Sequence, residues 1–446
     1  MDFIISLVSF ILTIAILVTI HEFGHFIVAK KLKIKVLRFS VGFGKIIKAW
    51  HIGDTKYTIC ALPFGGFVKM LDENESAVDE SEKHLAFNNQ SVYKRFAVVI
   101  AGPLANFVLA IIIFTFIFIS GTTGIRPIVG EVVPGGIGDI AGLNTGDQFV
   151  SINNNKTSTI NEFSLQFFQA LKNNEAKLEI KSLDDSINQL YIPIDDNFLD
   201  GIDNSIENYL GFSFSMPKLE PIIDKVLNDS PASFAGIKSN DKVLKVNDKN
   251  VLSWLDFVDE IKNSSNEPIQ IQVERDGKLL LFTLTPNNEN GDPKIGVSVH
   301  IPDNFRSDWF ITTKKNPVEA FILANERTYQ LVKLNLTMIK KMILGEASTS
   351  QLSGPIGIAD YAGKTAKTGI LSFMSFLALI SIGLGLINLL PIPALDGGHL
   401  LLFLVEMIKG SEVSKKTQQI LSKAGYLVIL SLITLALYND LNRLLF

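Results

Sequence analysis

Long apolar stretches alternate with polar segments along this chain and predict helices that cross a membrane. The first, "FIISLVSFILTIAILVTI" (Phe3–Ile20), has no charged residue, and Phe96–Ser120 and Ile370–Leu390 are similarly apolar. About 20 apolar residues are needed for a helix to span the hydrocarbon core. A fourth stretch, Gly425–Tyr438, is shorter and spans only if its flanking turns contribute. The pattern therefore predicts a polytopic α-helical membrane protein with four transmembrane helices.

The basic residues at the ends of these stretches predict an orientation. They gather between the first two apolar stretches, as in Lys30, Lys31, Lys94 and Arg95, and again between the last two. Cytoplasmic loops carry such an excess of lysine and arginine. The long segment 121–369 and both termini are therefore expected on the outer side. The net charge of -4 gives no indication of a nucleic-acid partner.

The outer segment contains an internal repeat. Gly130–Phe163 aligns with Asp224–Phe257 at a constant offset of 94 residues without a gap. Each copy combines short alternating strands with one amphipathic stretch, so two tandem α+β modules are predicted. Their shared pattern, A-G-[LI]-x-x-x-D-x-[FV]-x-x-[IV]-N, resembles bacterial PDZ domains, although Gly146 of the first copy is replaced by Asn240 in the second. The matched positions are Ala141/Ala235, Gly142/Gly236, Asp147/Asp241, Asn153/Asn247 and Phe163/Phe257.

A further amphipathic helix is predicted after the second module. Apolar residues recur with helical spacing within Asn316–Gly345, and Gly345 is a suitable helix end. The sequence leaves open whether this helix lies against the membrane or against the two modules.

The first apolar stretch continues into "HEFGH", which places ionisable side chains at membrane depth. Such groups are costly in lipid and by default mark a functional site. His21 and His25 lie one helical turn apart on the same face, so each can give one imidazole nitrogen to a single metal ion. Glu22 lies beside them and can accept a proton from water. The motif predicts a catalytic metal site.

A catalytic zinc site needs a third protein ligand and one open position. The end of the third apolar stretch offers Asp396 and His399, and the predicted topology brings it to the same side of the membrane as His25. His300 is excluded because it lies on the outer side. The cytoplasmic histidines, at positions 51 and 84, are weaker alternatives.

Together these motifs resemble the site-2 protease family of intramembrane zinc metalloproteases. "HEFGH" near the end of a first span and "NLLPIPALDGGHLL" near the end of a third carry the resemblance, which covers nearly the whole chain. Further matching pieces are "PFGGFVKM" (Pro63–Met70), "AGPLAN" (Ala101–Asn106) and "LSGPIGIA" (Leu352–Ala359).

The resemblance implies roles for individual residues. His21, His25 and Asp396 are the implied ligands of Zn²⁺, Glu22 is the implied general base, and His399 becomes a neighbour of the site. A second set is implied to lie near the substrate, with "PFGGFVKM" as a cytoplasmic-side hairpin loop that dips into the membrane. This set comprises Asn388, Pro391, Pro393, Gly65 and Gly66.

The predicted fold class is this four-helix membrane protein with two tandem PDZ-like domains inserted between the second and third spans. In chain order the expected parts are the first transmembrane helix (1–29), a cytoplasmic segment with the hairpin loop (30–95), the second transmembrane helix (96–120), PDZ-like domains (121–215 and 216–302), a periplasmic amphipathic helix and linker (303–369), the third transmembrane helix (370–401), a cytoplasmic segment (402–424) and the fourth transmembrane helix (425–446).

The family implies a bacterial inner-membrane enzyme that cleaves single-span membrane proteins, such as an anti-sigma factor in a stress response and remnant signal peptides. The PDZ pair would either dock a substrate tail or exclude substrates with bulky outer domains. Two other classes of protein share part of this pattern. A secondary transporter also carries intramembrane His and Asp, but this chain has no inverted repeat. An inactive PDZ scaffold is expected to lack Glu22 or a ligand, and neither is missing.

Overall fold

The computed structural model describes residues 2–74, 77–170, 175–193, 206–264, 267–289, 292–346 and 353–445. These residues form two compact units. One consists of Met1–Thr122 with Lys314–Phe446 and contains the apolar helices; the other is Thr123–Thr313 and contains the repeat.

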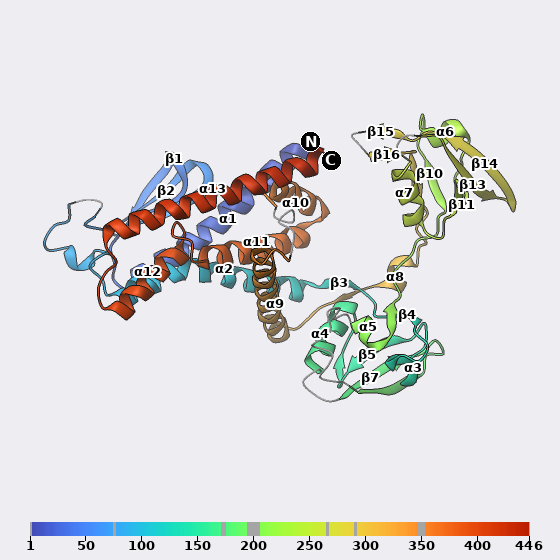
Figure 1. The fold of residues 1–446 in the computed structure, drawn as a ribbon, viewed down its shortest axis with the longest axis horizontal. Helices are drawn as coiled ribbons and strands as arrows, with labels where there is room; N and C mark the ends of the chain where they lie inside the picture. The colour runs from blue at the N-terminus through green and yellow to red at the C-terminus, as the bar shows by residue number, and fades with distance from the viewer. Residues whose placement is uncertain are drawn as a thin grey trace. The chain divides into compact units, whose positions relative to one another are not determined.

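The long apolar helices of the first unit are α1 (Asp2–Lys31), α2 (Val92–Ser120), α11 (Ile370–Leu389) and α13 (Lys415–Leu445). All four are long and apolar enough to cross a membrane, as the sequence predicts. The flanking turns do extend the fourth helix, which has 31 residues. Helices α1, α2 and α11 lie side by side around a shared apolar core (Figure 1).

The third span differs from the expectation of one helix over 370–401. Helix α11 ends at Leu389, and a separate helix, α12 (Asp396–Lys409), begins after a link formed by residues 390–395. Pro391 and Pro393 lie in the link, where each lacks the N–H that a continuing helix needs. The expected cytoplasmic segment 402–424 is therefore largely helical.

The double glycine at the start of α12 lets this helix fold back against the link. A Cβ atom at Gly397 would lie 2.1 Å from the carbonyl oxygen of Leu390, and one at Gly398 would lie 2.4 Å from Cα of Pro393. Only glycine permits such close backbone approaches. The position of Asp396 is thus set by the backbone packing of the residues around it.

A long hairpin, β1 (Val36–Ile52) and β2 (Thr55–Met70), follows the first helix, and the short 3-10 helix η1 (Lys83–Leu85) comes after it. The strands bend so that the first half of β1 pairs with both halves of β2: Phe39 lies opposite Tyr57 and also opposite Val68. Among the described residues, the last part of β2 therefore forms an edge of this sheet.

The segment "PFGGFVKM" was expected as a hairpin loop, and the structure makes it the second half of β2 instead. The tight turn of the hairpin lies at Gly53, which has a positive φ of 57°. Gly66 sits within the strand opposite Val41, where a Cβ atom would lie 2.6 Å from the carbonyl oxygen of Ser40. The glycine pair thus permits close strand packing rather than a turn.

Helix α9 (Pro317–Ile343) occupies the predicted amphipathic segment and is followed by α10 (Pro355–Thr368). The side chain of Asn316 caps α9 by accepting a hydrogen bond from the backbone N–H of Glu319. Ala324 and Leu331 of α9 are buried in the core that α2 and α11 share. Helix α9 thus packs on the apolar helices α2 and α11, an arrangement that neither expected alternative described.

The second unit contains two modules whose first seven elements follow the same order, after which the first has the helix α5 where the second has the strands β15 and β16. The first comprises β4 (Val129–Val132), α3 (Ile137–Ile140), β5 (Gln148–Ile152), β6 (Asn155–Lys156), α4 (Ile160–Ala170), β7 (Glu175–Lys181), β8 (Ile187–Pro193), α5 (Ile206–Leu210) and β9 (Phe212–Phe214). The second comprises β10 (Ile223–Val226), α6 (Pro231–Ala235), β11 (Lys242–Val246), β12 (Lys249–Asn250), α7 (Trp254–Lys262), β13 (Ile269–Arg275), β14 (Lys278–Leu284), β15 (Asn287–Glu289), β16 (Asp292–Lys294) and β17 (Val297–Val299). Their main sheets have the equivalent orders β6-β5-β7-β8 and β12-β11-β13-β14.

Two aligned positions of the repeat have equivalent contacts and backbone conformations in both modules. Asp147 and Asp241 are buried, and each accepts a backbone N–H from the residue three positions earlier at 2.8 Å. Gly146 and Asn240 both have positive φ, 92° and 68°. Asparagine tolerates this left-handed region better than other non-glycine residues, which explains how the second copy can carry Asn240 where the first has Gly146.

The chain enters and leaves the second unit through paired strands. Strand β3 (Thr122–Ile125) directly follows α2 and pairs with β18 (Phe310–Thr313), which precedes α9 and follows α8 (Phe305–Trp309). The Thr123 and Thr312 hydroxyls are 2.8 Å apart across this ribbon. We refer to β3 and β18 as the stem.

Candidate metal centre

His21 and His25 meet on one face of α1, near its C-terminal end. Their Nε2 atoms are 3.2 Å apart and their rings meet edge to face. Both side chains are buried. The H-E-x-x-H spacing thus directs two imidazole nitrogens to one point, as a metal site requires.

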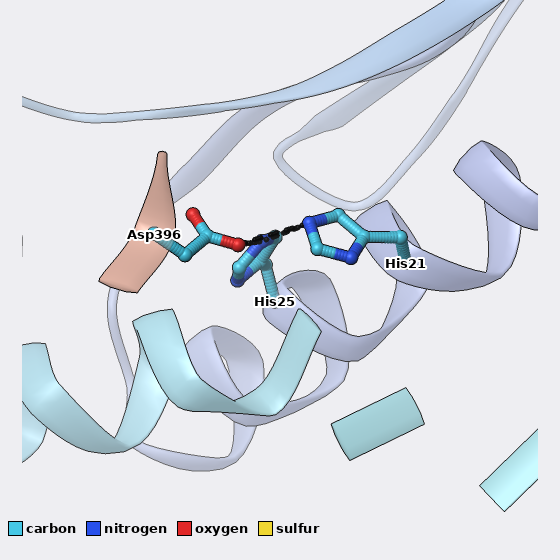
Figure 2. Close-up of side chains that lie close together, drawn as sticks. All are labelled: His21, His25 and Asp396. Atoms are coloured by element: carbon cyan, nitrogen blue, oxygen red, sulfur yellow. Dashed lines mark hydrogen bonds and ion pairs between the residues drawn. The ribbon is translucent and has the colours of Figure 1, made fainter. Parts of the chain in front are cut away.

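Asp396 comes to the same point from the first residue of α12. Its Oδ2 atom lies 3.0 Å from His21 Nε2 and 3.5 Å from His25 Nε2. Figure 2 shows the carboxylate and both rings pointing toward one another. The ligand atoms of these three residues all lie within 4.8 Å of one another, which is compatible with a single shared ion.

Two features show that this arrangement suits a cation. Asp396 Oδ2 is buried yet accepts no well-oriented hydrogen bond from any residue that the structure describes. Space beside the ring nitrogens is kept by Gly102 of α2, where a Cβ atom would lie 2.3 Å from His25 Nε2 and 2.9 Å from His21 Nε2. A carboxylate with an unused oxygen, two imidazoles and adjacent space form a donor set that fits zinc.

Helix α2 supplies a polar partner for the Nδ1 atom of each histidine. The Nδ1–H of His25 donates to the backbone carbonyl of Val98 at 2.8 Å, because a carbonyl can only accept. This bond leaves the Nε2 lone pair of His25 free for a metal. The side-chain amide of Asn106 lies 3.3 Å from Nδ1 of His21. Both histidines therefore have a second partner on the same helix.

Glu22 lies between the histidine pair and the hairpin edge. Its Oε2 atom accepts a hydrogen bond from the backbone N–H of Val68 at 3.1 Å. A Cβ atom at Gly66 would lie 3.5 Å from Glu22 Cγ, so the edge strand passes directly beside this side chain. Glu22 lies next to the cluster of the three ligand residues and is not a member of it.

The other predicted residues lie at varying distances from this centre. Asn388 is in the last turn of α11, and Pro391 and Pro393 are in the link that leads to Asp396. Gly65 lies in the edge strand with a φ of 133°, and a Cβ atom there would lie 2.2 Å from the ring of Phe43. Among the described residues, the structure gives the side chain of Asn388 no hydrogen bond.

The remaining histidines do not join the cluster. His399 is exposed on α12, and His51 is exposed on β1. Within the described ranges, the grouping that could hold a metal consists of His21, His25 and Asp396.

The sequence alone indicates no specific role for Gly102, Asn106 or Val68. A polar Asn within an apolar span was an available signal, because such a side chain requires an internal partner. Gly102 and Asn106 belong to "AGPLAN", a segment that the family resemblance includes without implying a role for it. The Val68 contact uses a backbone N–H, which no side-chain pattern can reveal.

Comparison with known proteins decides the family. The model of peptidase family M50 matches residues 9–432. The chain belongs to peptidase family M50. Regulator of sigma-E protease RseP of Escherichia coli (strain K12) is 35% identical over 455 residues, with 100% of both chains covered. Regulator of sigma E protease of Haemophilus influenzae is 37% identical over 452 residues, again with 100% of both chains covered. Protease RseP of Yersinia pestis is 34% identical over 454 residues, covering 98% of this chain and 99% of that one.

The expected likeness to the site-2 proteases, and within them to the regulator of sigma-E protease, is therefore confirmed. The M50 member described here is a zinc metallopeptidase of the site-2 type, with Zn²⁺ as its cofactor. Its apolar helices make it a multi-pass protein of the bacterial inner membrane.

Proposed function

We propose that this M50 peptidase hydrolyses single-span membrane proteins within or near the bilayer. In this proposal His21, His25 and Asp396 hold the zinc ion and Glu22 is the general base. The observation that carries the proposal is the convergence of three ligand atoms within 4.8 Å beside Glu22 of α1, a helix that can cross a membrane.

Zinc, when bound, supplies the Lewis acidity that peptide hydrolysis needs at neutral pH. Glu22 takes the proton of the attacking water and delivers it to the leaving amine. Asp396 and the histidine pair hold their positions because α12 packs on the link and the rings rest on α2. The wall of membrane helices limits access of other water to the bond under attack.

The substrate must present an unpaired backbone to this site. A helical substrate hides its carbonyls in its own hydrogen bonds, and unpaired backbone groups are costly in lipid. The edge formed by Gly66–Met70 passes beside Glu22 and offers backbone groups to an added strand. Asn388 bonds the substrate backbone on the other side, and Pro391 and Pro393 keep the nearby chain irregular. Gly65 and Gly66 keep the edge strand close to the rest of the sheet.

The substrates we propose are a single-span anti-sigma factor and remnant signal peptides. The printed names of the relatives describe regulators of sigma-E, which supports a role in regulated intramembrane proteolysis. The lipid bilayer is the second partner, and no nucleic acid is expected.

The orientation we propose places the repeat in the periplasm and the metal centre near the cytoplasmic side. The basic residues Lys30 and Lys31 end α1, a few residues beyond His25, which supports this assignment. A reporter fused after Tyr93 is expected to be cytoplasmic. A reporter inserted at Gly277, in the turn between β13 and β14, is expected to be periplasmic. The reverse pattern would overturn the orientation.

We assign the two modules as tandem PDZ-like domains between the second and third spans, with the boundaries 121–215 and 216–302. Their common sheet order supports one fold for both. The function we propose for them is to restrict access by substrates with bulky outer domains.

Docking of a substrate tail is a second candidate, and one observation favours it. The second module has a cavity of about 290 Å³ beside α7 and β17, lined by residues that include Trp254, Val258, Ile261 and Gly296. A groove between a helix and a strand edge is where an extended peptide adds to such a fold.

The proposed chemistry is tested with the purified full-length protein. Wild type is expected to contain zinc and to cleave a model single-span protein. Glu22→Gln is expected to retain zinc, because Glu22 is not a ligand, and to lose cleavage. His21→Ala is the matched variant that is expected to lose both. Cleavage by Glu22→Gln at the wild-type rate would remove Glu22 from the mechanism, and full zinc content in His21→Ala would refute the ligand set.

A further inference from the structure

Asn106 is a fully buried polar side chain in the apolar helix α2, and the mechanism above gives it no role. Its exposed fraction is 0%. Its side-chain amide nitrogen lies 3.3 Å from Nδ1 of His21. Its side-chain oxygen, also buried, has no partner among the residues that the structure describes. One half of the amide therefore faces a proposed zinc ligand, and the other half is unused.

The backbone around Asn106 holds this side chain in place. Ser381 of α11 is itself fully buried, and its hydroxyl donates to the carbonyl oxygen of Asn106 at 2.8 Å. A Cβ atom at Gly385 would lie 3.3 Å from Cβ of Asn106, so α11 and α2 approach closely here. Asn106 is thus fixed between the two helices, and little freedom remains except rotation of its amide.

The tautomer of His21 depends on which end of that amide faces Nδ1. With the –NH₂ group facing it, Nδ1 is the acceptor, and the ring proton is on Nε2, which lies 3.0 Å from Asp396 Oδ2. A neutral imidazole carries one proton, so an Nε2 that ligates a metal requires the proton on Nδ1. Half a turn of the amide brings the oxygen to Nδ1, and this oxygen accepts no other hydrogen bond in the described chain.

We infer that Asn106 is a positioning residue for the metal centre, which orients the ring of His21 and accepts the Nδ1–H when Nε2 binds zinc. The carbonyl of Val98, two helical turns earlier on α2, accepts the Nδ1–H of His25 in the same way. Such second partners of metal-binding histidines fix ring orientation and raise ligand basicity. This inference rests on the proposed ligand role of His21.

The test compares zinc affinity among variants of the full-length protein in detergent, measured by competition with a chromogenic chelator. Asn106→Leu keeps the size of the side chain and removes its hydrogen bonding, so zinc affinity is expected to fall about 10- to 100-fold. Asn106→Asp keeps an acceptor toward Nδ1, and its affinity is expected to stay near that of wild type. Thr328→Val is the matched control: it removes the buried hydroxyl that donates to the carbonyl oxygen of Ala324 on α9, touches neither Asn106 nor His21, and is expected to leave zinc affinity unchanged.

Two outcomes would overturn the inference: wild-type affinity in Asn106→Leu, or equal losses in Asn106→Leu and Asn106→Asp. The melting temperature of each metal-free variant separates a packing defect from a metal-site defect, because the inference expects the metal-free melting temperatures of Asn106→Leu and Thr328→Val to be similar. His21→Ala separates this inference from the proposed function. If His21→Ala binds zinc as wild type does, the ligand set is wrong; if only Asn106→Leu binds as wild type does, the positioning role alone is wrong.

Discussion

The backbone N–H of Val68 donates a hydrogen bond to Oε2 of Glu22 at 3.1 Å. It links the proposed general base to the free edge of the hairpin sheet, where Val68 lies opposite Phe39 of β1. A substrate strand that adds to this edge needs outward-facing N–H groups such as this one. We therefore expect strand addition to compete with Glu22 for the Val68 N–H, so that the base is released as the substrate is seated.

This relationship predicts the effect of Val68→Pro. Proline removes the outward-facing N–H and is tolerated on an edge strand. Loss of one hydrogen bond of about 1 kcal/mol should weaken substrate binding roughly 5-fold. Steady-state kinetics on a single-span substrate should show the change in KM, with zinc content retained. Val68→Thr keeps the N–H and the branched shape, and should behave as wild type. An unchanged KM in Val68→Pro would exclude pairing at this position.

The third ligand is tested by replacing each of the two candidates on α12 with alanine in turn. Asp396→Ala should lose zinc and activity, because its Oδ2 is the only oxygen in the described cluster with the two imidazole nitrogens. His399→Ala should retain zinc and most of its activity, because His399 is exposed. Zinc content by mass spectrometry and cleavage of a model substrate provide the measurement. Loss of zinc in His399→Ala with retention in Asp396→Ala would reverse the assignment.

Gly102→Ala tests the space beside the ring nitrogens. The added Cβ would lie 2.3 Å from His25 Nε2, so the rings must move, and zinc affinity should fall by more than about 10-fold. Helix propensity does not explain such a loss, since alanine is favoured over glycine by about 1 kcal/mol within a helix. Gly383→Ala on α11 is the matched control, because a Cβ atom there meets nothing within 4 Å. Equal zinc affinity in both variants would contradict this account of Gly102.

The two candidate roles of the modules give opposite results when the modules are removed. Deletion of Ile128–Val299 should leave zinc binding intact, since the cluster lies wholly in the other unit. If the modules exclude bulky substrates, the deletion should cleave a substrate whose outer domain has not been trimmed. If they dock a tail, a folded, zinc-loaded deletion should lose the trimmed substrate. Val258→Trp, which fills the cavity in the second module, should impair cleavage of the trimmed substrate only under docking.

The repeat illustrates what the sequence can predict well. Its constant offset places Asp147 on Asp241, and the two carboxylates make equivalent turn contacts because identical local patterns fold in the same way. The histidine pair is predicted equally well, since residues four apart on a helix must share a face. The proximity of Asp396 came from the family resemblance and a topological argument, and the structure agrees.

Other features were not accessible from local pattern. Asp396 begins a new helix whose backbone folds back onto the preceding link at Gly397 and Gly398, and this packing is a tertiary contact that local pattern does not show. The hairpin loop at Gly66 was implied by the family resemblance, whereas the strand that the structure shows depends on pairing with the first half of β1, which is a tertiary contact. The role of Asn106 could not be predicted, because its partner, His21, lies on another helix and is far from it in the sequence.

The stem makes the second unit an exchangeable part of the chain. Since β3 and β18 are hydrogen-bonded neighbours, the two points where the unit joins the rest lie one strand spacing apart, about 5 Å. If the unit is removed, a tight turn is enough to connect the two points. Any domain whose own termini are adjacent can be inserted between them. A lineage could therefore gain, lose or duplicate such modules at this position while the helices that carry His21 and Asp396 keep their covalent frame.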